Sequence, residues 1–538
     1  MVMLPVRDLG ATGLVTDISP YNLPLNAYSK AFNVRFDEGK VKRASVFRTI
    51  VDNSGFLPRT AVANTPSSGF DTLVCVADDW SIQELINGTY LDRSGSITGS
   101  TDPRPFNSTS LANITYINRE DRVPVYRTAN GTNFADLPNW PSDHRCKSLR
   151  AYGDFLVALN TTETSVNFPT RVRFSDIAQA NSVPSSWDDT DTTKSAGFND
   201  LVDLKDPILD GLSLQSNFII YTQSEVMLME FVGGTFLFNF RKLFNDAGLI
   251  NTNCVVEVEG RHYCFAKSDI YMHDGTSKES ICDNRIREFV FKNINAKNVD
   301  RYFVHHDPVL NEVHFCFQSG DPDAYFPNAD RCNRSAVYNY RNNTWSIMDL
   351  PNISASAVIN VNNVKTYSES TTITYDGVGG SYYDQEDSFN RQSVMVGESD
   401  TTDGITSDKV YGLDTADNGR MTFEIDDEAT KPVLLERIGM DMDEIRERLS
   451  GYKVVNAIYP QIQTENAQLT NVTFEFGASD IPQNTPTFSE SRTYDIASDY
   501  KIDSRVSGRY LSYRLIFSDN KDVEFSGFDL DVTTTGRR

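Results

Sequence analysis

Residues 217–228 read NFIIYTQSEVML, and residues 261–272, which begin 44 positions later, read RHYCFAKSDIYM. Each stretch contains an apolar run, a short polar turn with a serine and an acid, and a second apolar run. Runs of β-branched and aromatic residues separated by turn residues are typical of antiparallel hairpins. Weaker copies of this hairpin begin near Thr72, Ile114, Phe155 and Val313.

The six hairpin starts are separated by 42, 41, 62, 44 and 52 residues. A period of roughly 40 to 50 residues built from antiparallel hairpins is typical of a β-propeller, in which four-stranded blades surround an axis. The sequence therefore predicts a propeller of about six blades over residues 61–430. A tandem array of β-sandwiches is the alternative interpretation of the same pattern.

A later segment extends the repeat. Residues 407–414 (SDKVYGLD) resemble residues 268–274 (SDIYMHD), so we expect them to complete or close the ring. An insertion near residues 371–403, rich in Ser, Thr, Gly, Tyr and acidic residues, precedes this segment. We expect the insertion to form a loop or small hairpin that projects from the ring.

The two ends of the chain differ from the repeat region. From residue 431 onward the strands are longer and alternate, as in residues 511–517, where Leu511, Tyr513, Leu515 and Phe517 share one face. The sequence therefore predicts a C-terminal β-sandwich-like domain over residues 431–538. Residues 1–60 are expected to form an extended segment and first strands that contribute to the propeller or its interface. Helical periodicity is nearly absent, and residues 441–449 form a short exposed turn at most, so the protein is predicted to be mainly β.

Composition excludes several functional classes. The chain has 538 residues, with 50 Lys plus Arg against 74 Asp plus Glu and a formal charge of −24. Tight nonspecific binding to nucleic acid needs clustered basic residues. The excess of acidic residues therefore disfavours such binding. No apolar run approaches the ~18 to 20 residues of a membrane span, so we expect no direct membrane insertion. The N-terminus lacks a secretory pattern, and the seven cysteines are expected to be reduced thiols of a protein made in the cytoplasm.

One group of residues has the composition of a metal site. It contains Cys254, His262, Cys264, His273 and Cys282. Their spacing matches no zinc pattern and spans hairpin strands. We therefore expect buried thiols and solvated imidazoles rather than metal ligands.

Catalytic signatures are also missing from the sequence, which has no HExxH, GxSxG, Walker or CxxC motif. Residues 305–307 (HHD) have the composition of an acid–base pair, but neighbouring residues of a strand face opposite ways, so a loop position without chemistry is expected. Acidic segments are expected to be solvated loops; they lie at residues 188–191, 321–330, 426–428 and 441–444. The sequence therefore predicts no catalytic, cofactor-binding or metal residues, no cofactor and no enzymatic activity.

The two ends of the chain resemble a known family. Residues 18–43 read ISPYNLPLNAYSKAFNVRFDEGKVKR and resemble the opening of structural tail proteins of short-tailed bacteriophages. Residues 506–514 (VSGRYLSYR), residues 525–532 (FSGFDLDV) and the terminal GRR carry a second resemblance. Both ends are similar to the tail nozzle, or tail tubular protein B, of podoviruses, although Tyr28 stands where tryptophan is common.

This resemblance implies a propeller subunit that assembles as a hexameric ring below the portal and adaptor. The ring would form the distal tail tube, or nozzle, through which viral double-stranded DNA leaves the particle without tight binding. The implied partners are further copies of the chain, the adaptor (head-to-tail connector) protein, and tail fibres or tail-tip proteins. The implied location is the virion tail, after synthesis in the host bacterial cytoplasm. An acidic wall that repels phosphates agrees with this role.

Several questions stay open at the level of sequence. Residues 371–403 and the loop at residues 181–206 are candidate gate segments, and residues 188–191 are a candidate lining of the lumen. One alternative function is a receptor-binding or fibre-anchoring tail protein, trimeric, with Tyr382 and Tyr383 touching a host glycan. Another is a glycan-cleaving propeller enzyme, which needs two carboxylates in one cleft.

Overall fold

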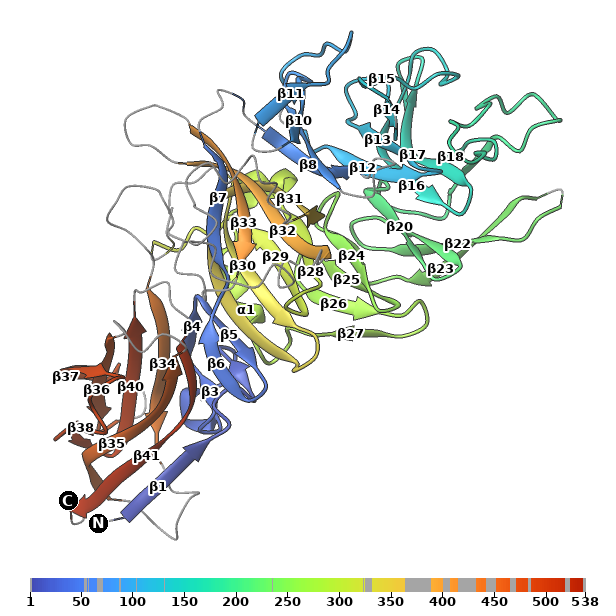
Figure 1. Ribbon diagram of the computed structural model, residues 1–538. Helices are drawn as coiled ribbons and strands as arrows, with labels where there is room; N and C mark the ends of the chain where they lie inside the picture. The colour runs from blue at the N-terminus through green and yellow to red at the C-terminus, as the bar shows by residue number, and fades with distance from the viewer. Residues whose placement is uncertain are drawn as a thin grey trace, which may run out of the picture.

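The protein consists almost entirely of β-strands. The computed structural model describes residues 2–52, 56, 58–64, 71–86, 89–102, 104–129, 131–234, 236–322, 324, 331–362, 389–399, 407–414, 432–441, 451–464, 471–481, 485–517 and 523–535. These residues form a propeller and a β-sandwich that lies beside it, with both chain termini at the far end of the sandwich (Figure 1).

Six groups of four consecutive antiparallel strands form six blades of the propeller (Figure 1). The predicted hairpins are the second and third strands of these blades, so the propeller prediction is confirmed and the alternative array of sandwiches is not observed in this region. The blades contain, in chain order, β8 (Pro58–Asn64), β9 (Thr72–Ala77), β10 (Ile82–Ile86) and β11 (Thr89–Asp92); β12 (Asn107–Leu111), β13 (Ile114–Asn118), β14 (Val125–Thr128) and β15 (Ala135–Asp136); β16 (His144–Tyr152), β17 (Phe155–Glu163), β18 (Val166–Phe174) and β19 (Gly197–Asp200); β20 (Asp210–Leu214), β21 (Asn217–Tyr221), β22 (Val226–Phe231) and β23 (Phe238–Phe244); β24 (Val255–Val258), β25 (Arg261–Phe265), β26 (Ile270–His273) and β27 (Lys278–Ser280); β28 (Phe303–Asp307), β29 (Glu312–Phe317), β30 (Cys332–Asn339) and β31 (Thr344–Asn362).

A seventh blade closes the ring. The first part of β31 pairs with β30, and from Ile353 onward β31 pairs with β32 (Phe389–Ser399). β32 pairs with β33 (Ser407–Asp414), and β33 pairs with β7 (Val46–Asp52) from the N-terminal part of the chain. This sheet packs against blade 1 through a shared apolar cluster that includes Ala61 and Ile359. Residues 407–414 therefore complete the ring as predicted, and the described part of the chain contains one blade more than the six repeats.

The insertion near residues 371–403 was expected to form a loop or small hairpin that projects from the ring, but its residues 389–399 belong to a blade. Residues 389–399 form β32 and pair on both sides, because the strand fills the gap between β31 and β33. Residues 371–388 and 400–403 lie outside the described part of the chain.

Aromatic side chains fill the spaces between neighbouring blades. Trp80 of the β9–β10 turn packs edge-on against Phe106, which precedes β12, with ring centroids 5.0 Å apart. Trp140 and Trp187 pack in the same way at 4.6 Å between blades 2 and 3. Large rings suit these spaces because blade faces twist and leave wedge-shaped gaps.

The sandwich contains two sheets. Its predicted face of residues 511–517 is confirmed, since Leu511, Tyr513, Leu515 and Phe517 are all buried. One sheet contains β1 (Val2–Arg7), β5 (Val34–Asp37), β6 (Lys40–Arg43), β35 (Tyr452–Thr464), β38 (Ile502–Asp503), β39 (Ser507–Gly508) and β41 (Val523–Thr535), and the other contains β4 (Lys30–Phe32), β34 (Val433–Met440), β36 (Asn471–Ser479), β37 (Thr487–Asp495) and β40 (Tyr510–Phe517).

The N-terminal residues are divided among three parts of the fold. Residues 1–60 were expected to contribute an extended segment and first strands to the propeller or its interface. In the structure β1 pairs with β41 and β5 pairs with β6 inside the sandwich, while β7 belongs to blade 7 and β8 begins blade 1. Of the expected turn at residues 441–449, only residue 441 is described. The short remaining elements are β2 (Gly13–Leu14), β3 (Ala27–Tyr28), η1 (Pro20–Asn22), α1 (Arg287–Asn293) and η2 (Ala296–Arg301).

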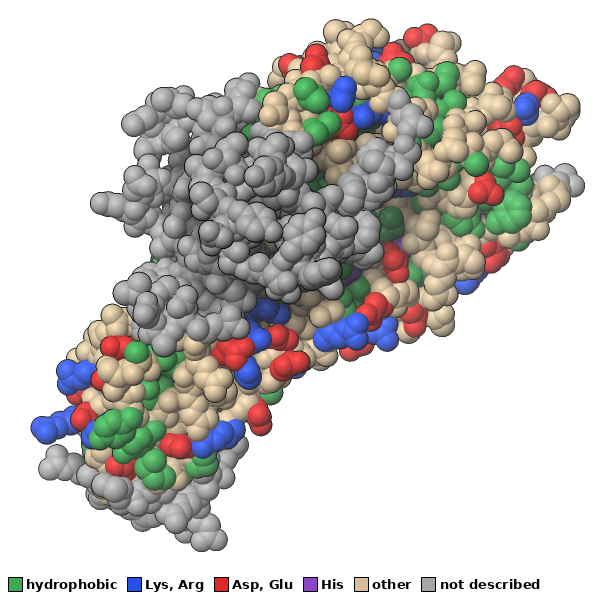
Figure 2. Space-filling view, in the orientation of Figure 1, with side chains coloured by type: hydrophobic (Ala, Val, Ile, Leu, Met, Phe, Trp, Pro, Cys, Tyr) green, Lys and Arg blue, Asp and Glu red, His purple; other side chains and the backbone are tan. Residues whose placement is uncertain are grey.

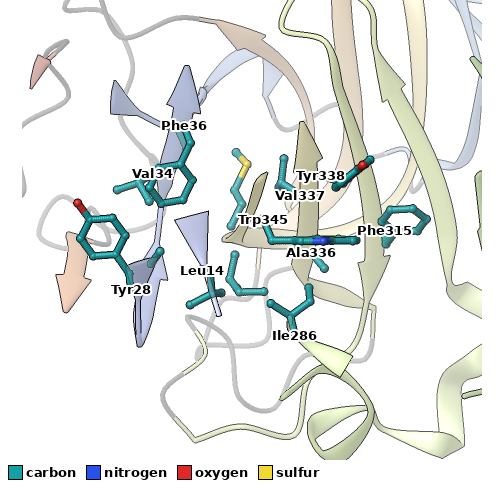
Figure 3. Packing of buried hydrophobic residues seen from close by; sticks show 14 of the residues in the cluster. Leu14, Tyr28, Val34, Phe36, Ile286, Phe315, Ala336, Val337, Tyr338 and Trp345 are labelled. Carbon is teal, nitrogen blue, oxygen red and sulfur yellow. The ribbon is translucent and has the colours of Figure 1, made fainter. Parts of the chain in front are cut away.

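A continuous sheet joins the propeller to the sandwich. β4 lies between β31 of blade 6 and β34 of the sandwich, with Phe32 opposite Ile347 on one side and Leu434 on the other. Figure 3 shows the packed core at this junction, where Leu14 lies between the strand that carries Phe36 and the blade 6 strand that carries Trp345. The two parts therefore share one hydrophobic core.

We predict that Trp345→Ala destabilises the whole protein. The Trp345 side chain is 1% exposed, and its indole Nε1 donates to the Ile281 carbonyl oxygen at 2.9 Å. Its loss leaves a cavity and an unpaired carbonyl, which lowers the free energy of unfolding by about 3–5 kcal/mol in urea titrations. Tyr500→Ala, at a ring that is 72% exposed, is the matched control and changes it by less than about 0.5 kcal/mol. Equal effects of the two variants would contradict the assignment of Trp345 to the junction core.

Candidate functional site at the propeller axis

The inner strands of the seven blades surround a cavity of about 210 Å³ on the propeller axis. Residues of β8, β12, β16, β20, β24, β28 and the second part of β31 all line it. Four arginines and two aspartates are among the lining side chains: Arg59, Arg104, Arg150, Arg301, Asp78 and Asp300. The wall of this cavity is polar, although the interiors of the surrounding blades are apolar.

Polar side chains from three blades, and backbone carbonyl oxygens from a fourth, meet on this axis. Arg150 of β16 donates to both carboxylate oxygens of Asp210, at 2.8 and 2.6 Å, and to the Ser108 carbonyl oxygen of β12 at 2.9 Å. Arg150 also donates to Asn253 Oδ1 at 2.9 Å, and Asn253 Nδ2 donates to the Phe106 carbonyl oxygen at 2.7 Å. The last bond runs from the start of blade 5 to the start of blade 2. We name Arg150, Asp210 and Asn253 the axial network.

The Asp210 carboxylate is the buried anion of this network, with no exposed side-chain surface. Burial acts to raise its pKa, but the charge and hydrogen bonds of Arg150, with those of Ser148 and the Asn253 backbone, outweigh burial and lower the pKa overall. Asp210 is therefore ionised at neutral pH. A general acid for glycoside hydrolysis needs a raised pKa instead.

The sequence-predicted group of cysteines and histidines forms part of the blade cores. Cys254, Cys264 and Cys282 are buried free thiols, as expected, and burial raises the pKa of each. The imidazoles of His262 and His273 are also buried, so the expectation of solvated rings was wrong. Among the described residues no group of three or more His, Cys, Asp and Glu side chains is placed to hold a metal ion.

The two imidazoles are buried because a tyrosine from the neighbouring blade joins them. Tyr221 Oη lies 2.6 Å from His262 Nδ1 and 2.6 Å from His273 Nε2. The Ser213 carbonyl oxygen accepts from His262 Nε2 at 2.9 Å, and the Gly275 N–H donates to His273 Nδ1 at 3.2 Å. These two outer partners fix both tautomers, so the Tyr221 hydroxyl donates to His262 and accepts from His273. We name this chain of three side chains the Tyr–His relay.

The Tyr–His relay is complete only when both rings are neutral. Burial lowers the pKa of His262 to about 4 and, together with the charge of His262, lowers the pKa of His273 to about 3. A proton added to His262 Nδ1 would face the hydroxyl proton of Tyr221, and a proton added to His273 Nδ1 would face the Gly275 N–H. Protonation of either ring therefore opposes folding. No local sequence pattern indicated Tyr221 or the axial network, because their partners lie on other blades.

The other histidine candidate lies on a strand rather than in the expected loop. Residues 303–307 form β28, in which His305 and Asp307 are buried and His306 is half-buried. Burial and the neighbouring His314 lower the pKa of His305 to about 3. Asp307 Oδ1 accepts from the backbone N–H groups of Val309 and Leu310, at 2.9 and 3.1 Å, and so shapes the following turn.

The acidic segments that the sequence predicts to be solvated loops lie in different parts of the fold. Residues 188–191 lie in the connection between β18 and β19, where Asp188 and Asp191 are bonded to Thr190 and Thr193 of the same segment. The loop at residues 181–206 contains β19 and so is not wholly irregular. Asp321 pairs with the buried Arg334, and the remaining acids of its segment lie outside the described residues. Residues 426–428, 442–444, Tyr382 and Tyr383 are outside them as well.

The residues that carry the family resemblance lie in the sandwich and at its junction with the propeller. Asn33 has a positive φ of 58°, which asparagine tolerates better than most residues. Its side chain donates to Asp349 Oδ2 at 3.1 Å and accepts from the Asp349 N–H at 2.9 Å, so it fastens the N-terminal segment to β31. Lys40 and Lys42 both pair with Glu524 of β41, at 2.6 and 3.0 Å.

We predict that Asp210→Ala weakens the fold more than removal of an exposed acid. The variant leaves Arg150 without its buried carboxylate, which costs about 3–5 kcal/mol in the free energy of unfolding. Asp246→Ala is the control, because that carboxylate is 78% exposed and forms a surface ion pair with Lys278; its effect is expected to stay within about 0.5 kcal/mol. Urea unfolding at pH 7 distinguishes the two, and similar midpoints would show that the axial network is not structural.

We also predict that stability falls below neutral pH before most carboxylates titrate. The unfolded chain binds protons on His262 and His273 near pH 6.5, whereas the folded chain does so near 4 and 3, so the unfolded state gains protons as the pH drops. Each ring should cost about 2 kcal/mol between pH 7 and pH 5. Urea titrations at pH 7, 6 and 5 measure this slope, and His273→Gln should reduce it. An unchanged slope in that variant would contradict the Tyr–His relay.

The sequence matches no protein-family model and no curated protein. Among solved structures, the chain is similar to the WD40 repeats of RRP9, with 10% sequence identity over 69% of this chain and 98% of that chain and a TM-score of 0.35. This likeness does not bear on what the chain binds or assembles with.

Proposed function

We propose that the chain is a structural virion protein that forms the distal tail tube, or nozzle, of a short-tailed bacteriophage. In this role it is a subunit of a ring-shaped conduit for genome ejection, attached below the portal and adaptor, and it has no enzymatic activity. The supporting observation is where the two resembling segments lie. Residues 18–43 are far from residues 506–514 and 525–532 in the sequence, yet strands β4, β5 and β6 of the first stretch and β39, β40 and β41 of the second lie in one β-sandwich, in which Val41 of β6 faces Phe525 of β41.

This arrangement supports the proposal because the two sequence segments that carry the resemblance belong to one structural module. β4, which lies inside residues 18–43, also joins the sandwich to blade 6. A subunit of a conduit needs its parts to keep a fixed orientation while DNA passes. A continuous sheet and a shared core give that rigidity without a hinge.

The DNA path in this proposal runs between subunits and not along the axis of one propeller. The axial network occupies part of that axis, and the remaining cavity of about 210 Å³ is far too small for a duplex. Heterologous contacts between neighbouring copies close a cyclic ring around a wider bore. The charge of −24 per subunit supports weak interaction of the wall with phosphates.

We predict a six-fold ring with an axial channel when the purified protein, or the intact particle, is imaged by electron microscopy. The decisive measurement is the rotational symmetry, with native mass spectrometry as an independent count of subunits. A trimer with a closed centre would contradict the nozzle and favour the receptor-binding or fibre-anchoring alternative. A stable monomer at high protein concentration would contradict both.

A separate measurement tests the enzymatic alternative. Asp78, which lines the axial cavity, is bonded to Arg59 Nε at 2.6 Å, and Asp210 is held by Arg150. The lowered pKa of Asp210, caused chiefly by Arg150, disfavours that carboxyl as a protonated catalytic acid. Release of reducing sugar from host-surface polysaccharide by the purified protein would overturn the proposal that the chain has no enzymatic activity.

A further inference from the structure

The hairpin of β22 and β23 ends in an apolar tip. Residues 231–238 read FVGGTFLF and contain no charged side chain. Phe236 is 79% exposed, Phe231 is 55% exposed and Val232 is 53% exposed. Figure 1 shows that this hairpin projects from blade 4 at the end of the molecule opposite the sandwich, and Figure 2 shows hydrophobic side chains gathered there. Large apolar groups concentrated on a projection indicate a binding surface.

The base of the hairpin is rigid. The Phe238 ring packs against Tyr152, Phe155 and Phe174, with ring centroids 5.8, 5.3 and 4.8 Å apart. At the apex Gly233 and Gly234 have φ values of 70° and 86°, which residues with a Cβ rarely adopt, so the turn depends on glycine. The hairpin thus holds its tip away from the core.

A neighbouring segment widens the apolar surface. Val202, which follows β19, is 84% exposed and lines one groove together with Val232 and Phe236. We name Phe231, Val232, Phe236 and Val202 the apolar tip.

Asp200 and Asp203 line the same groove as Val232 and Phe236, and further polar groups behind the apolar tip are paired with each other. Glu230 Oε1 accepts from Asn239 Nδ2 at 2.6 Å across the base of the hairpin. Lys242 donates to Glu225 at 3.0 Å and to the Asp203 carbonyl oxygen at 2.9 Å. The surface side chains of the hairpin therefore change from apolar at its apex to polar toward its base, while Phe238 fills the buried side of the base. Side chains that sit at a membrane surface have this order, because their apolar parts enter the acyl region while polar groups stay in water.

We propose that the apolar tip inserts shallowly into a lipid surface. A protein partner would need about 800 Å² of complementary surface per side for a stable contact, and a single projecting hairpin offers less. A bilayer needs no shape complementarity, since its affinity follows buried apolar area. The expected absence of membrane insertion concerns spanning segments, and no helix among the described residues is long and apolar enough to cross a membrane. Shallow insertion of a hairpin tip does not need such a segment.

The inference rests on the proposed function only for the number of apolar tips that one assembled ring would present. Six copies in a ring would present six tips together, and linked weak sites bind far more tightly than one. A single chain still carries the complete apolar tip, so a monomer can be tested as well as a ring. The net charge of −24 predicts that anionic lipids repel the protein at low salt, whereas zwitterionic lipids do not.

The test measures co-sedimentation of the full-length protein with phosphatidylcholine vesicles. The double variant Val232→Ser with Phe236→Ser should bind at least about tenfold more weakly, because two exposed apolar side chains no longer enter the bilayer. Ile481→Ser, at a side chain of the sandwich that is 54% exposed, is the matched control and should bind like the unchanged protein. Phe236→Trp should show a blue-shifted emission on binding and quenching by brominated acyl chains.

Other results would overturn the inference. Absence of vesicle binding by the unchanged protein, or equal binding by the double variant, contradicts insertion of this tip. Stronger binding to anionic than to zwitterionic vesicles at low salt indicates a basic surface instead. If the double variant changes the sedimentation coefficient but not vesicle binding, the tip is a contact between subunits. Because the subunit number is measured separately, failure of lipid binding leaves the nozzle proposal intact, and failure of the ring leaves lipid binding intact.

Discussion

β31 connects the parts of this molecule because one strand of 19 residues takes part in three sets of backbone pairs. It closes blade 6 by pairing with β30, begins blade 7 by pairing with β32, and holds β4 of the sandwich at Ile347. Its two blade pairings change partner at Ile353, where the register also shifts. The orientation of the sandwich, the closure of the ring and the position of the N-terminal segment all follow from this strand.

The N-terminal residues reach these places only through long-range contacts. β7 pairs with β33 across about 360 positions of sequence, and β1 pairs with β41 across more than 500. Closing such loops costs conformational entropy before the contacts form, although that cost grows slowly with length. Extensive backbone pairing and a shared apolar core offset it. The two ends of the chain therefore stabilise the same module.

Two buried polar networks of the propeller pair side chains that come from different blades. The axial network joins Arg150, Asp210 and Asn253 from three successive blades, and the Tyr–His relay joins Tyr221 to the two histidines of the next blade. An unpaired buried polar group costs free energy, so each network favours one relative position of its blades. Both networks add to the rigidity that a conduit requires, and the apolar tip lies beyond them on an anchored hairpin.

Local sequence patterns determined the elements of the fold. Alternation and turn residues located the hairpins at residues 217–228 and 261–272, the closing strand at residues 407–414, and the buried face of Leu511 to Phe517, because the period of a strand is a local property. The tertiary structure alone decided which strands meet. It placed the N-terminal strands in the sandwich, buried His262 and His273 around a tyrosine from another blade, and left Phe236 exposed although its residue type favours burial. Each of these outcomes depends on partners distant in sequence, for which no local pattern exists.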